Sequence, residues 1–139
     1  MESEILKTLQ EKVYHVLYQE KTDSTNVWAG RLAREGAPSR TLVCADMQTD
    51  GRGRRGRRWE SPPGESLYMT LILRPDFCPQ QASMLTLVTG LSVAQALCAM
   101  TGLKALLKWP NDVVVSGKKI CGILTEMSAG MERVEYILI

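Results

Sequence analysis

Arginine and glycine are concentrated in one short stretch, Gly51 to Arg58, which holds five arginines and three glycines. Glycine leaves the backbone free to adopt positive φ and to approach a ligand closely. The planar guanidinium group of arginine donates paired hydrogen bonds to carboxylate and phosphate oxygens. The stretch therefore predicts a flexible cationic loop able to wrap an anionic small molecule. A disordered basic patch that touches nucleic acid, or no ligand, is the alternative.

A second polar cluster, Asp23-Ser24-Thr25-Asn26, lies between a predicted strand and a predicted helix. In the simpler interpretation, Ser24 or Thr25 is the N-cap of that helix and has no further role. An exposed helix N-terminus, with hydroxyls and free N–H groups, also suits the polar head of a ligand. The two interpretations are compatible.

The third cluster is Lys108-Trp109-Pro110-Asn111-Asp112, followed after a short hairpin by residues 118–124. Lys119 opens an otherwise apolar strand, where its charge could meet a carboxylate or a phosphate. Gly122 would let a ligand lie flat on that strand. A solvated Lys108 and ordinary turn chemistry after the proline are the alternatives.

Charge and composition limit the class of protein. The chain has 139 residues, 45% of them hydrophobic, which is typical of one globular domain. It carries 17 basic and 15 acidic residues, and without the five arginines of the loop the balance is 12 to 15. The positive charge is therefore local, and aromatic residues are only 6%. Both facts argue against a nucleic-acid-binding domain.

Metal binding and membrane insertion are not expected. Cys44, Cys98 and Cys121 stand in apolar surroundings without any C-x-x-C pair, and His15 is the single histidine. The longest apolar stretch, residues 84–100, is interrupted by polar residues, and no signal peptide is recognised. We expect a soluble cytoplasmic protein.

Hydrophobic periodicity and breaker residues predict the order of elements. Gly36 and Pro38 end the first long helix, and Ser116-Gly117 forms a hairpin turn. The long helix at 80–101 has two apolar stripes, which predicts packing on more than one side. The pattern indicates an α+β fold with a mixed, largely antiparallel sheet and helices packed on it. Helices are expected at 4–12, 27–35 and 80–101, and strands at 13–19, 41–45, 66–74, 105–109, 113–115, 119–126 and 134–139.

Four motifs in this order resemble the biotin–protein ligase family, also called biotin–[acetyl-CoA-carboxylase] ligase or holocarboxylase synthetase. They are D-S-T-N, Q-x-x-G-R-G-R-R-G-R-x-W, K-W-P-N-D and K-K-x-x-G-I-L. The resemblance runs from about Val13 to Ile139. It implies the catalytic fold related to class II aminoacyl-tRNA synthetases and lipoate ligases.

The resemblance also implies roles for individual residues at the positions that match the motifs. The ureido ring of biotin is held by the D-S-T-N motif, a glutamine side chain and the loop backbone, and its carboxylate lies between an arginine and a lysine. A third group lies on the nucleotide side. The biotin-binding set is Ser24, Thr25, Asn26, Gln48, Gly51, Arg52, Gly53, Arg54, Lys119, Gly122 and Leu124, and the ATP or adenylate set is Arg54, Trp59, Asn111 and Asp112.

The implied activity is activation of biotin with MgATP to biotinyl-5′-adenylate and transfer of biotin to a lysine of a biotin carboxyl carrier domain. Adenylation brings a carboxylate and a triphosphate together, and fixed cations offset their repulsion. We therefore expect Arg54 and Lys119 to be catalytic, without a covalent enzyme intermediate. The loop is expected to be mobile when empty and to order over the ligand.

Residues 1–139 are expected to be the N-terminal part of the catalytic domain, with no winged-helix domain before it and the rest of the enzyme after it. A lipoate or octanoyl ligase of the same fold is the nearest alternative, although its families lack the G-R-G-R-R-G-R loop. A homodimer is left open.

Overall fold

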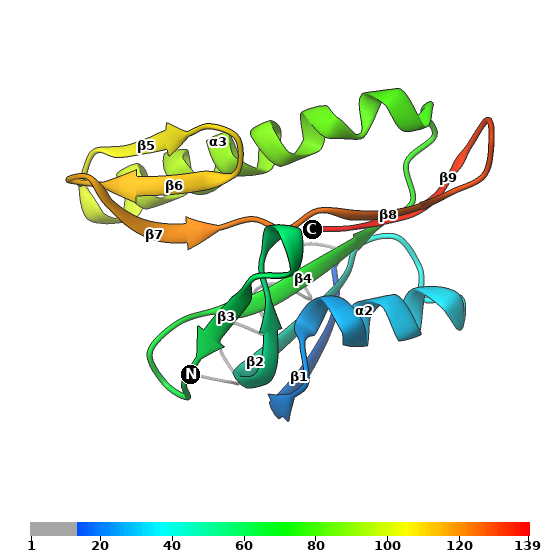
Figure 1. Cartoon of the computed structure of the whole chain (residues 1–139), viewed down its shortest axis with the longest axis horizontal. Coiled ribbons are helices and arrows are strands. Elements are labelled where there is room, and N and C mark those ends of the chain that lie inside the picture. The colour runs from blue at the N-terminus through cyan, green and yellow to red at the C-terminus, as the bar shows by residue number, and fades with distance from the viewer. Residues whose placement is uncertain (1–13) are drawn as a thin grey trace.

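The computed structural model describes residues 14–139, so the helix expected at 4–12 lies outside the described residues. The elements are β1 (His15–Thr22), α2 (Thr25–Arg34), β2 (Thr41–Arg52), η1 (Arg54–Gly56), β3 (Arg58–Ser61), β4 (Tyr68–Leu73), η2 (Pro79–Gln81), α3 (Ser83–Thr101), β5 (Ala105–Lys108), β6 (Asp112–Val115), β7 (Lys118–Gly122), β8 (Glu126–Ala129) and β9 (Val134–Leu138). Figure 1 shows two sheets, each with one helix beside it, and β8 and β9 of the larger sheet run beneath α3.

The α+β fold is confirmed. The larger sheet has the order β1-β2-β4-β9-β8, with β3 paired to β2. Strands β1 and β2 run parallel, and every other pair in it is antiparallel. A smaller antiparallel sheet has the order β5-β6-β7. Its β6–β7 hairpin turns at Ser116 and Gly117, both with positive φ, as expected.

Helix α2 covers the larger sheet and forms its core. Its apolar residues recur at helical spacing and meet inward-facing residues of three strands. Gly36 follows the helix with φ of 95°, which explains the C-terminal boundary. The buried cluster consists of Trp28, Ala29, Ala33, Val43, Ile72 and Leu138.

Helix α3 packs against both the smaller sheet and β9, but much of its apolar surface is exposed. Only Gly90 and Ala94 are buried, and Ala94 packs with Ala105 and Val113 of the smaller sheet. A Cβ at Gly90 would meet Leu107 Cδ2 at 2.8 Å, so a small residue allows the close approach. Val93, Leu97 and Cys98 pack against this same cluster of the smaller sheet, and Leu85, at the start of the helix, packs against the buried cluster that contains Val134 and Ile137 of β9. Met84, Val88, Leu91 and Met100 are exposed.

The segment Pro79–Thr101 is long and apolar enough to cross a membrane. Its most apolar stretch of 18 residues has a mean hydropathy of 1.6, and 11% of that stretch is buried. This finding differs from the sequence expectation. One such helix is weak evidence, because apolar helices of soluble proteins have the same length and composition.

Two other expectations require correction. The loop Gly51–Arg58 is a hairpin: β2 continues to Arg52, which pairs with Arg58 of β3, and η1 forms the turn. The strand expected at 119–126 is two strands, β7 and β8, which belong to different sheets. Buried Ile123 lies between them and exchanges hydrogen bonds with Asn111, through Ile123 N to Asn111 O (3.0 Å) and Asn111 Nδ2 to Ile123 O (2.9 Å).

Asp23 stabilises the start of α2. Ser24 occupies the N-cap position but its side chain makes no capping bond. Instead, Asp23 Oδ1 accepts from Ser24 N (2.7 Å) and from the Thr22 hydroxyl (3.1 Å), and Asp23 Oδ2 lies 2.9 Å from Arg31 Nη1. The hydrogen bond from Arg31 is the main cause that lowers the pKa of Asp23 from 3.8 to about 2.

Asp23→Asn is expected to destabilise the protein at neutral pH and not at strongly acidic pH. A carboxylate whose pKa is lowered by folding stabilises the folded state above its unfolded pKa, and this contribution disappears as pH falls through the folded pKa. The difference in free energy of unfolding between wild type and variant is therefore full above about pH 4 and lost towards pH 2. Urea denaturation across this range measures it. Exposed Asp76→Asn is the control, and a difference that stays constant with pH would contradict the assignment.

Candidate functional site

A chain of hydrogen bonds connects the start of α2 to β2 and β3. Gln48 Oε1 accepts from Thr25 N (2.8 Å) and from the Thr25 hydroxyl (3.1 Å). Gln48 Nε2 donates to Ser61 Oγ (2.9 Å), and Ser61 in turn donates to Trp59 O (3.3 Å). The bonds orient the Gln48 amide, with its oxygen towards α2 and its nitrogen towards the hairpin. Predicted site residues Thr25 and Gln48 are thus in direct contact.

Thr70 of β4 holds the same region from beneath. Thr70 is fully buried. Its hydroxyl donates to Asn26 Oδ1 (2.6 Å) or to Thr25 Oγ1 (2.8 Å). Asn26 Nδ2 donates to Glu126 Oε1 (2.9 Å) and to Leu124 O (3.3 Å). Buried polar groups require such partners.

Thr70→Val is expected to lower the free energy of unfolding by about 1–3 kcal/mol, because Asn26 and Thr25 each lose a buried partner. Urea denaturation measures the loss. Thr70→Ser is the matched control, because it keeps the hydroxyl and removes a methyl group. Equal stability of the valine variant and wild type would show that the hydroxyl does not hold the network.

A cation cluster lies where β3 meets the smaller sheet. Lys119 Nζ is 2.8 Å from Asp112 Oδ1 and 4.8 Å from the centroid of the Trp59 ring. That carboxylate oxygen is buried and has no hydrogen bond in the described residues, so the ion pair with Lys119 offsets its burial. A Cβ at Gly122 would meet the Trp59 ring at 3.0 Å. The indole therefore covers the strand face that was expected to receive a flat ligand.

Arg54 joins this cluster from the hairpin. Its Nη1 lies 3.4 Å from Asn111 Oδ1, a long hydrogen bond between exposed groups. Asn111 is itself fixed through its bond to Ile123 O. The predicted catalytic pair, Arg54 and Lys119, thus contacts neighbouring residues of the K-W-P-N-D motif.

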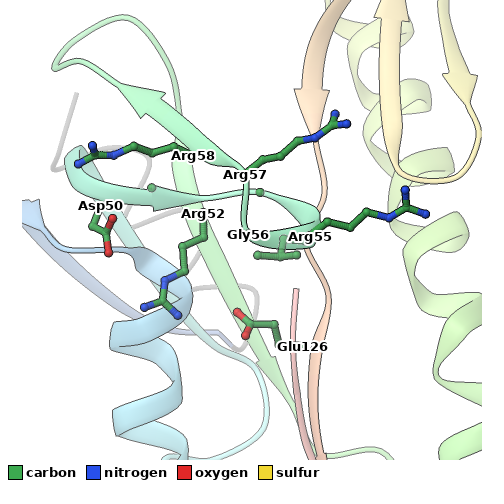
Figure 2. A pocket seen from close by; sticks show the side chains of 10 residues that line it. Asp50, Arg52, Arg55, Gly56, Arg57, Arg58 and Glu126 are labelled. Carbon is green, nitrogen blue, oxygen red and sulfur yellow. The ribbon is translucent and has the colours of Figure 1, made fainter.

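A cavity of about 690 Å³ lies between the hairpin and the segment that joins β7 to β8. Figure 2 shows Arg55 and Arg57 extending towards the smaller sheet and Arg58 extending the other way, while the Glu126 carboxylate faces the hairpin. The lining is basic with two carboxylates. It consists of Asp50, Gly51, Arg52, Gly53, Arg55, Gly56, Arg57, Arg58, Leu124 and Glu126.

The predicted residues therefore form three neighbouring groups. Gly51, Arg52, Gly53 and Leu124 line the cavity. The buried network behind it holds Thr25, Asn26 and Gln48, with Ser24 beside them and 2% exposed. The cation cluster holds Arg54, Trp59, Asn111, Asp112, Lys119 and Gly122.

A family model described as the biotin/lipoate A/B protein ligase family matches residues 17–139. The chain belongs to this family. The bifunctional ligase/repressor BirA of Bacillus spizizenii is 46% identical over 140 residues, which are 99% of this chain and 43% of that protein. The biotin–[acetyl-CoA-carboxylase] ligase of Paracoccus denitrificans is 41% identical, over 86% of this chain and 50% of that protein. The chain thus spans half or less of the length of these relatives.

Solved structures of ligases have the same fold. The biotin protein ligase from Aquifex aeolicus in complex with biotin and ATP superposes with a TM-score of 0.69 at 34% identity, covering 89% of this chain and 50% of that one. The Leishmania major enzyme in complex with biotin gives 0.74 at 30% identity, covering 89% and 54%. The family resemblance drawn from the four motifs is confirmed.

In this ligase-family chain, sequence reasoning missed Thr70, Ser61 and Glu126 as parts of the site. Thr70 is the polar residue in a strand of apolar neighbours, Tyr68–Leu73, and this is the one signal that could have marked it. Ser61 and Glu126 carry no local signal, because their partners are 13 and 100 residues away.

The four cysteines are free thiols, of which Cys78 is exposed and the other three are partly buried. Burial raises the pKa of the Cys44 and Cys121 thiols, which keeps them protonated and unreactive at neutral pH. Residues 14–139 contain no group of three or more His, Cys, Asp or Glu side chains that could hold a metal ion.

Proposed function

We propose that this protein is a biotin–protein ligase, which activates biotin with MgATP to biotinyl-5′-adenylate and transfers biotin to a lysine of a biotin carboxyl carrier domain. One observation carries the proposal: the cavity walled by Gly51–Gly53 and Leu124 adjoins the cation cluster of Arg54 and Lys119. A site for a small ring thus borders a site for anions. The likeness to ligase structures with biotin and ATP supports it.

We assign the binding residues the following roles, which their positions support. The ring of biotin takes the cavity, against the backbone of Gly51, Arg52 and Gly53, with Ser24, Thr25, Asn26 and Gln48 forming the buried base behind it and Leu124 the opposite wall. Gly122 lies under the valeryl chain, once Trp59 moves off that strand. Arginine side chains around the cavity supply positive potential for the triphosphate.

Electrostatic stabilisation is the proposed catalytic contribution. Attack of a biotin carboxylate oxygen on the α-phosphorus of ATP forms the mixed anhydride and releases pyrophosphate. Arg54 and Lys119 stabilise the charge that accumulates on the transferring phosphoryl group. Trp59, Asn111 and Asp112 lie beside these cations and are assigned to the nucleotide side. Asp112 holds Lys119 in place through the 2.8 Å contact.

Pyrophosphate release with biotin and MgATP tests the proposal. It is measured on the chain of 139 residues and on a form extended at its C-terminus by the remainder of a relative's catalytic domain. Release that depends on biotin, and not on lipoate at the same concentration, is expected. Release with lipoate alone would assign the chain to the lipoate branch of the family. Salt-sensitive binding to generic DNA, with no response to biotin, would support a nucleic-acid-binding domain instead.

The remaining assignments belong to the same proposal. Residues 1–139 form the N-terminal part of the catalytic domain, and the protein works in the cytoplasm with biotin, MgATP and the carrier domain as partners. We propose no nucleic-acid partner for this domain, since without the five hairpin arginines its acidic residues outnumber its basic ones by 15 to 12.

A further inference from the structure

The side-chain amide of Asn26 is engaged entirely within the protein. Its two amide hydrogens go to Glu126 Oε1 at 2.9 Å and Leu124 O at 3.3 Å, and its oxygen accepts from Thr70 at 2.6 Å. The residue is 8% exposed. No amide hydrogen remains for a ligand, so direct recognition by this side chain would require one of these bonds to break.

The same bonds join parts of the chain that are far apart in sequence. Asn26 lies in the first turn of α2, whereas Leu124 and Glu126 lie 98 and 100 residues later, where the chain crosses between the two sheets. Leu124 and Glu126 form one wall of the cavity, opposite Gly51 and Arg52 of the hairpin. In Figure 2 the Glu126 carboxylate is directed from this wall towards the hairpin. The position of the wall therefore depends on Asn26.

We propose that Asn26 and Glu126 are a positioning pair, which holds the Leu124–Glu126 wall at the spacing that fits the ring of biotin against the hairpin. Asn26 acts on the ligand through this wall and does not touch it. The inference rests on the proposed function and refines one of its assignments, because it moves Asn26 from the ligand contacts to their support.

Charge offers a competing role for Glu126. Its side chain is exposed, and Arg52 and Asp50 line the same cavity. A carboxylate there could act directly on a ligand or balance Arg52. The two roles differ in what they require, since a hydrogen-bond acceptor for Asn26 need not be charged, whereas a direct electrostatic role needs the carboxylate.

Four variants separate these roles: Glu126→Gln, Glu126→Ala, Asn26→Asp and the double variant Asn26→Asp with Glu126→Gln. The glutamine keeps an acceptor for Asn26 and removes the charge, and the alanine removes both. The carboxylate introduced by Asn26→Asp would face the Glu126 carboxylate and the Leu124 carbonyl. In the double variant, the introduced glutamine could donate to the introduced aspartate and so rescue the contact. Biotin affinity is measured by calorimetry, and thermal unfolding reports whether each variant folds.

The expected affinity pattern is specific. Glu126→Gln stays within about twofold of wild type. Glu126→Ala and Asn26→Asp weaken biotin binding by about tenfold or more, and the double variant recovers part of the loss. Equal weakening by glutamine and alanine at position 126 would overturn the proposal in favour of a direct charge effect. Unchanged affinity in Glu126→Ala would overturn it as well.

Hydrogen exchange tests the pair without a ligand. The backbone amides of residues 124–126 are expected to exchange faster in Glu126→Ala and at the wild-type rate in Glu126→Gln, because only the first loses the bond to Asn26. Identical exchange in both variants and wild type would overturn the positioning role. If wild type binds no biotin, the proposed function fails, while this measurement still decides the role of the pair.

Discussion

Lys119→Ala is expected to slow formation of the adenylate by about 10²–10³-fold, the usual cost of removing one preorganised group that stabilises transition-state charge. Lys119 lies on β7 of the smaller sheet, and it contacts both Asp112 and the ring of Trp59. Its loss removes one of the two cations to which we assign stabilisation of the transferring phosphoryl group. Pyrophosphate release under saturating biotin and MgATP measures the effect.

The fold should survive this change. The Lys119 side chain is 41% exposed, so its ion pair is screened by solvent and adds at most about 1 kcal/mol to stability. Lys119→Met keeps most of the aliphatic packing against Trp59 and Gly122 and should be as slow as the alanine variant. If Lys119→Met had the wild-type rate, the loss in Lys119→Ala would be due to packing and not to charge.

Lys118→Ala is the matched control. Lys118 is the preceding residue of β7, pairs through its backbone with Val115, and is exposed. Because successive side chains of a strand point to opposite faces, Lys118 lies on the other face from Lys119. Its variant should keep the wild-type rate. Wild-type activity in Lys119→Ala would contradict the hypothesis that the charge of Lys119 stabilises the transition state.

Local signals predicted most elements of the fold. The alternation in residues 66–74, the glycine and proline after α2 and the Ser116-Gly117 turn are all features of neighbouring residues, and the structure places strand, helix end and hairpin there. The residues of the four motifs also lie near one another in space, around the hairpin.

Contacts between distant residues account for what the sequence did not predict. The run at 119–126 contains Gly122 as its one breaker residue, and it divides between two sheets just after this glycine, where Asn111 of the β5–β6 turn exchanges hydrogen bonds with Ile123. The arginine-rich stretch has loop composition, yet Gly51 and Arg52 pair with Trp59 and Arg58 as a hairpin. The bond between Asn26 and Glu126 spans 100 residues, which no local pattern encodes.

Gly51→Ala is expected to be the most disruptive small substitution in the hairpin. A Cβ at position 51 would clash with the backbone oxygen of Trp59 and would meet Ser61 Oγ at 2.8 Å. Backbone cannot rotate away as a side chain can, so β3 must separate from β2. We expect the free energy of unfolding to fall by about 1–3 kcal/mol, the usual range for overpacking a buried position.

Gly51→Ala should also weaken biotin binding. The loss of affinity should be larger than partial unfolding of the variant alone would cause. Ser61 must move, which breaks its bond from Gln48 and releases the amide that Thr25 orients, while the cavity wall at Gly51 shifts with β3. Gly30→Ala in α2 is the control, because its Cβ meets other atoms only at an ordinary 3.5 Å and alanine favours a helix. Calorimetry with biotin and urea denaturation on both variants separate the effects. Tight biotin binding by Gly51→Ala would mean that the ligand does not depend on the β2–β3 hairpin, and the cavity beside it would then not be the biotin site.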